Sequence, residues 1–118
     1  MLQKEKLNKK EAEASVQSDF YAERKACVDK LKELMSKKHT ELAQAELWLQ
    51  MADIAVREKG DSAPEIGAYL SSAQAQMSAP ELPHDAAYAD ACRRFAPTFA
   101  KLGREAYAKQ LLQNASML

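Results

Sequence analysis

The residues of this 118-residue chain best suited to nucleophilic or metal chemistry are two histidines and two cysteines. His39 and His84 each stand without a second His, Cys or paired carboxylate at the spacing that metal ligands need. Cys27 and Cys92 lie 65 positions apart in helical patterns, and we predict that both are small buried hydrophobic side chains. The spacing alone leaves a disulfide between the two cysteines open.

Other arrangements that carry catalysis are also missing from the sequence. The three glycines are too far apart to form a phosphate-binding loop. No isolated pair of carboxylates lies within an apolar run, which is the setting that acid–base catalysis favours. We therefore predict that the chain is not an enzyme and that it holds no catalytic residue, no metal and no cofactor.

The composition is that of a helical globular domain. Hydrophobic residues make up 47% of the chain and charged residues 29%, a balance that separates it from disordered sequences. Only three glycines and four prolines are present, too few for the many turns of an all-β fold. No apolar run reaches the ~18 residues of a membrane span. The first residues lack the apolar core of a secretory signal, so we expect a cytoplasmic protein.

The most informative element is a helix expected over residues 41–59, because it is apolar around most of its circumference. The polar residues inside it form one narrow stripe, and they are Glu46, Gln50, Asp53 and Arg57. A surface helix normally shows the reverse pattern, so this helix needs cover on two flanks, from its own chain or from a partner. The residues that we expect at an interface are Leu47, Trp48, Leu49, Met51, Ala52 and Val56.

Further helices are expected on both sides of this element. The first runs from about Ser18 to Lys38, where apolar residues recur seven apart. Thr40 is the expected N-cap of the second helix, and Gly60 follows its end. A capping box over residues 62–65 predicts the start of a third helix, which ends at about Met77.

A last helix is expected after the proline-containing loop over residues 78–85. Asp85 caps it, and its apolar stripe continues past Pro97, which cannot join the helical hydrogen bonding. No segment alternates apolar and polar residues as a strand does. The sequence therefore predicts an all-α fold, either a four-helix bundle or stacked helical hairpins, with the last helix kinked or broken at Pro97.

Charge divides the chain into three parts. Residues 1–40 carry ten basic and seven acidic side chains, residues 41–92 two and nine, and residues 93–118 five and one. Residues 1–15 are expected to form a charged extension that frays or orders on a partner, and residues 16–118 a single helical domain. The basic residues expected to form a charged docking face are Arg93, Arg94, Lys101 and Arg104.

By elimination, and from the apolar helix, we predict a small protein–protein interaction module, such as an adaptor, a chaperone-like protein or a regulatory subunit. Its partner is a protein, with a homodimer as one option. The alternative is a DNA-binding regulator, since residues 54–70 resemble the first two helices of a winged-helix domain. That resemblance implies a recognition helix further along, but residues 71–85 contain no Lys or Arg for phosphate contacts, so nucleic acid is the less favoured partner.

Overall fold

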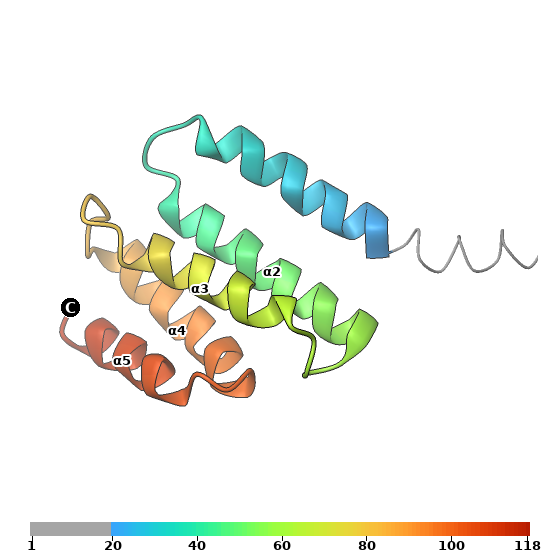
Figure 1. The fold of residues 1–118 in the computed structure, drawn as a ribbon. Coiled ribbons are helices and arrows are strands. Elements are labelled where there is room, and N and C mark those ends of the chain that lie inside the picture. Colours follow the sequence, from blue (N-terminus) through green and yellow to red (C-terminus); the bar gives the residue numbers. More distant parts are fainter. Residues whose placement is uncertain (1–19) are drawn as a thin grey trace, which may run out of the picture.

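The computed structural model describes residues 20–118, and every regular element in this range is an α-helix. A helix that we call the leading helix covers residues 20–35. The others are α2 (Glu41–Lys59), α3 (Glu65–Met77), α4 (Ala86–Lys101) and α5 (Glu105–Ser116) (Figure 1). The prediction of an all-α helical bundle is confirmed. The expected extension over residues 1–15 lies outside the described residues, and no described helix is long and apolar enough to cross a membrane.

Several helix ends follow the sequence signals. α2 has the expected bounds, and Gly60 after it adopts a φ of 90°, a conformation that favours glycine. The Asp85 carboxylate caps α4 by accepting a hydrogen bond from the Tyr88 amide at 3.0 Å. The leading helix ends before the expected Lys38. In the turn that follows, the Leu34 carbonyl accepts from the Lys37 amide at 2.9 Å and from the Thr40 hydroxyl at 2.9 Å.

The capping box expected over residues 62–65 does not form. α3 begins at Glu65, with Pro64 before it and no side-chain cap. The Glu65 carboxylate is paired with Lys59 at 2.7 Å instead of reaching back to a cap residue. A turn in which the Ala63 amide donates to the Gly60 carbonyl at 3.3 Å occupies the place of the expected first helical turn.

The predicted last helix is in fact two helices, so the described range has five helical segments rather than four. α4 continues through Pro97. Proline has no amide hydrogen, so the Arg93 carbonyl one turn earlier loses its helical partner. Both residues are exposed, so this carbonyl can be hydrated instead. The break comes later, where Gly103 adopts a φ of 96° between α4 and α5. Of the two alternatives for Pro97, the break is therefore wrong, and the kink stays a prediction.

The helices form two hairpins that pack side by side. α2 packs mainly on α3 and α4 on α5, and a smaller contact joins α2 to α4. In Figure 1 the leading helix lies beside α2 at the outer edge of this array. The largest fully buried side chains inside the two hairpins are Leu70, Met77, Cys92, Phe99 and Leu111.

Two separate apolar clusters cover the two flanks of α2. The main core is built from α2, α3, α4 and α5 together with loop residues between them. The small cluster consists of Cys27 from the leading helix with Met51 and Ile54 from α2. Trp48 and Tyr69 are half-buried and pack against both clusters, with ring centroids 6.0 Å apart. The two flanks of α2 are thus covered by the chain itself.

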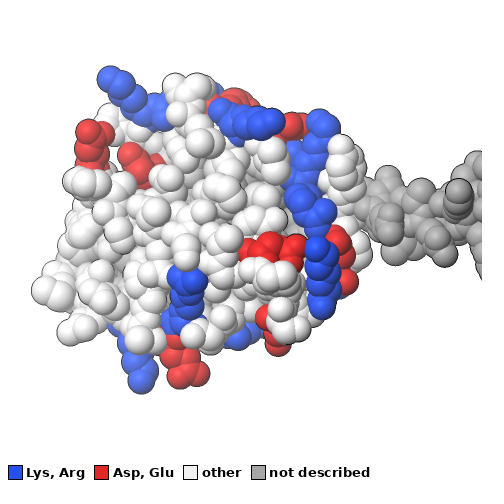
Figure 2. Space-filling view, viewed as in Figure 1, with Lys and Arg blue, Asp and Glu red and all other residues white. Residues whose placement is uncertain are grey.

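Charged side chains gather where the described chain begins. Figure 2 shows positive and negative groups next to one another at this end of the molecule. Arg24 of the leading helix pairs with Glu58, and Glu23 pairs with Arg57 at 3.0 Å, so both pairs join the leading helix to α2.

Candidate functional site

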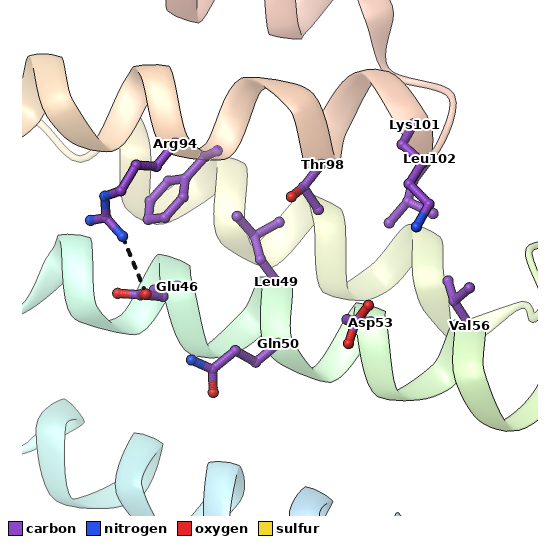
Figure 3. Close-up of a pocket in the computed structure, with 10 residues that line it drawn as sticks. Glu46, Leu49, Gln50, Asp53, Val56, Arg94, Thr98, Lys101 and Leu102 are labelled. Atoms are coloured by element: carbon purple, nitrogen blue, oxygen red, sulfur yellow. Dashed lines mark hydrogen bonds and ion pairs between the residues drawn. The ribbon is translucent and has the colours of Figure 1, made fainter.

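A groove runs between α2 and α4 on the side where these two helices make little contact. It has a volume of about 300 Å³. The side chains labelled in Figure 3 show that α2 and α4 run in the same direction along it, with α3 behind. Leu49 and Phe95 are buried at its floor, and Val56 and Leu102 are half-buried at one end. The apolar floor of the groove is therefore itself buried, and solvent reaches apolar side chains mainly at the end where Val56 and Leu102 lie.

The polar residues on the two rims of the groove have the same spacing. Each rim contributes side chains at positions i, i+4 and i+7, which places them on one face of their helix. They are Glu46, Gln50 and Asp53 on α2, and Arg94, Thr98 and Lys101 on α4. The α2 rim therefore carries two carboxylates and the α4 rim two cations, and these groups can hold the ends of a polar ligand on either side of an apolar contact.

An ion pair bridges one end of the groove. The Arg94 guanidinium donates to Asp90 at 2.9 Å and reaches across to Glu46 at 3.2 Å, as the dashed line in Figure 3 shows. At the other end Asp53 pairs with Arg57 at 3.0 Å, within its own helix. Lys101 has no hydrogen-bond or ion-pair partner among residues 20–118, so its ammonium group is available to a ligand.

The six predicted interface residues fall into three environments. Leu49 and Val56 line the groove. Leu47 and Met51 face the leading helix in the small cluster, and half-buried Trp48 packs against both clusters. Ala52 is fully buried in the main core. These residues therefore do not form one continuous exposed surface.

The predicted charged docking face is divided as well. Arg94 and Lys101 line the groove, whereas Arg93 is exposed outside it. Arg104 is not on the same helix, because the chain turns at Gly103 before α5 begins. Its guanidinium donates to the Gly67 carbonyl at 3.0 Å, which ties it to α3. A single basic face on one helix, as the sequence analysis expected, does not exist.

The cysteines and histidines are also placed by the structure. Cys27 and Cys92 are buried free thiols in different clusters, and burial raises the pKa of both. The exposed His84 ring stacks on Tyr88 with ring centroids 4.0 Å apart, and His39 lies in the turn before α2. Over residues 20–118, no group of three or more potential ligands lies together as a metal site would require.

The segment considered for DNA binding forms the end of α2 and the first part of α3. α3 contains no Lys or Arg, and its buried side chains pack in the main core. DNA binding stays a prediction without a contact that favours it.

The α2–α4 groove was not identified from the sequence, although one signal for it exists. The polar stripe of α2 and the sequence around Thr98 share the i, i+4, i+7 spacing, with acidic groups in one and basic groups in the other. That match could have indicated that the two helices face each other. Comparison with known protein families, with curated proteins and with solved structures finds no match.

Proposed function

We propose that this chain is a protein–protein interaction module without enzymatic activity of its own, and that it binds a segment of a partner protein in the α2–α4 groove. The observation that supports this proposal is the groove itself, in which an apolar floor lies between two rims of opposite charge. Its volume of about 300 Å³ lies at the lower end of the range for ligand sites. A groove of that size accepts one or two side chains of a longer segment.

The chemistry of the rims suits a peptide. Gln50 and Thr98 offer both hydrogen-bond donors and acceptors near the middle of the groove, as backbone groups of a bound segment require. Lys101 lies at the end of the groove opposite the Arg94–Glu46 pair, and its ammonium group has no partner among residues 20–118. We therefore expect a segment with an apolar side chain on Leu49 and Phe95 and an acidic group beside Lys101.

The expected affinity is modest. Stable protein–protein complexes bury about 800 Å² on each partner, and one short groove provides less than that. We expect dissociation constants of roughly 1–100 μM, equivalent to about −8 to −5.5 kcal/mol, with fast release.

A random peptide library displayed on phage tests this proposal. Peptides selected on the wild-type protein are measured against Thr98→Arg, which places a long side chain in the groove. The matched control is Gln110→Arg, which adds the same side chain at an exposed position of α5. We expect Thr98→Arg to weaken binding at least about tenfold and Gln110→Arg to leave it unchanged, by fluorescence anisotropy.

Two results would overturn the proposal. One is a selection that yields no peptide that binds the wild-type protein in solution. The other is a set of peptides that bind the Thr98→Arg variant as well as the wild type while both variants keep the helical circular dichroism of the parent.

A further inference from the structure

The leading helix is attached to the rest of the molecule by a contact that is separate from the main core. No residue of the range 20–35 belongs to that core. It buries Cys27 in the small cluster, with Phe20 and Val28 half-buried beside it, and it also buries Leu31 and Leu34. The leading helix can therefore leave α2 while the two hairpins keep their own packing.

The polar contacts of the leading helix are weak ones. Glu23 and Arg57 pair at 3.0 Å, but their side chains are 48% and 46% exposed, and ion pairs so open to solvent contribute little. Arg24 pairs with Glu58 at the same end of the helix. These pairs select the correct face and register without holding the helix strongly.

The connection between the leading helix and α2 is short and strained. It consists of residues 36–40, where His39 adopts a φ of 63° although it is not glycine. The His39 side chain is exposed, so no burial compensates for this conformation. The turn also lines an open surface depression of about 450 Å³. The Thr40 hydroxyl holds the turn by donating to the Leu34 carbonyl at 2.9 Å and the Lys37 carbonyl at 3.2 Å. Short strained connections of this kind favour exchange of the element that they carry.

We propose that the leading helix exchanges between two copies of this chain, so that each copy covers α2 of the other in a swapped homodimer. The helix that covers this face of α2 in the dimer comes from a second copy, because the leading helix already fits the face. It places Cys27 against Met51 and Ile54 and pairs with Glu58 and Arg57. Exchange re-forms between copies the contacts that the leading helix makes with α2. It also lets the turn straighten, which relieves His39 but gives up the hydrogen bonds from the Thr40 hydroxyl to the Leu34 and Lys37 carbonyls. This proposal does not depend on peptide binding in the α2–α4 groove.

Light scattering coupled to size-exclusion chromatography tests the exchange. The protein is refolded from urea over a range of concentrations, so that trapped forms equilibrate. We expect a dimer fraction that rises with concentration. Glycine accepts a φ of 63° without strain, so His39→Gly removes from the monomer the strain that exchange would otherwise relieve. Forming one dimer straightens two such turns. We therefore expect His39→Gly to lower the dimerisation constant roughly tenfold or more. A wild type that is monomeric at every concentration, or a dimer that His39→Gly leaves unchanged, would overturn the proposal.

A mixed cross-linking experiment separates exchange from any other dimer. Cys27 lies near Gln50, with Sγ and Oε1 3.6 Å apart. A copy with Cys27→Ser and Gln50→Cys is refolded together with the wild type and treated with a short reagent that joins two thiols, while Cys92 stays buried in both. Exchange predicts a covalent dimer between the two species, and a Gln110→Cys copy in place of the Gln50→Cys copy predicts none. A dimer by light scattering without this cross-link would show that another surface joins the copies and would contradict the exchange.

Discussion

At the scale of single residues, Arg104 makes the most extensive polar contacts between the two hairpins. Its guanidinium donates to the Gly67 carbonyl, to the Ser71 hydroxyl at 3.1 Å and to the Gln74 side chain. Arg104→Ala removes all of these bonds. A hydrogen bond from a charged donor contributes about 1.5–3 kcal/mol, but two of the three are exposed to solvent and contribute little. We expect the free energy of unfolding in urea to fall by about 1–2 kcal/mol.

The matched control for this substitution is Arg93→Ala. Arg93 is exposed and has no hydrogen-bond or ion-pair partner among the described residues. Its removal should change the free energy of unfolding by less than about 0.5 kcal/mol. Equal losses for the two arginines would contradict the role assigned to Arg104.

At the scale of the helices, Pro97 and Gly103 have opposite effects on the same part of the chain. Pro97→Ala returns an amide hydrogen to the interior of α4, and we expect the free energy of unfolding to rise by about 1–3 kcal/mol.

Gly103→Ala forces alanine into a φ of 96° with no steric contact within 4 Å, and we expect the free energy of unfolding to fall by about 1 kcal/mol from the backbone alone. Urea unfolding measures both, and a gain for Gly103→Ala would show that the turn tolerates other conformations.

The two cysteines report on the leading helix and on the main core separately. Cys27 belongs to the leading helix and is buried against Met51 and Ile54 of α2, whereas Cys92 is fully buried in the main core. If the leading helix opens without the hairpins, Cys27 should react with a thiol reagent at neutral pH much faster than Cys92, whose labelling needs global unfolding. Mass spectrometry of peptides after timed labelling measures the two rates. Equal rates would mean that the chain opens as one unit.

Helix boundaries show how far local sequence signals reach. α2 was predicted with its correct ends, and Gly60 marks its C-terminal end through a φ of 90°. The expected cap by Thr40 does not form, because the Thr40 hydroxyl donates to the Leu34 and Lys37 carbonyls instead. The start of α3 was wrong, because Glu65 pairs with Lys59 from the preceding helix and no local rule describes that contact. The split between α4 and α5 was also missed, although Gly103 was a local signal for it.

At the scale of the whole molecule, stability should depend on pH at both ends of the range. Hydrogen bonds from lysines lower the pKa of Asp29, Glu33 and Glu65. A lowered pKa in the folded state means stability that is present above the ordinary value of about 4 and is lost as the pH falls through the folded pKa. Burial raises the pKa of Cys92 and Tyr107, so their contribution is present below their ordinary values of about 8.5 and 10 and is lost above them.

We therefore expect a plateau in the free energy of unfolding between about pH 5 and pH 8, with losses on both sides. Glu65→Gln should reduce the loss on the acidic side because it removes the carboxylate that Lys59 holds ionised. Asp61→Asn is the control, since Asp61 is exposed and has no ion pair among the described residues. An acidic slope that Glu65→Gln leaves unchanged would contradict this assignment.

The sequence specified the fold class more clearly than the candidate site. The apolar circumference of α2 required cover on two flanks, and the chain supplies it through the leading helix on one side and the two hairpins on the other. Which residues stay uncovered depends on how the hairpins pack. The groove exists because α2 and α4 meet only weakly, and no periodicity within one helix contains that information.

The measurement that tests the central claim most directly is a titration of the isotopically labelled protein with a peptide selected on it, followed by the shifts of the backbone amide signals. If the α2–α4 groove is the binding site, the largest shifts should lie along residues 46–56 and 94–102, and Thr98→Arg should abolish them. Shifts centred on the outer face of α5, or the same shifts in the Thr98→Arg variant, would contradict the account.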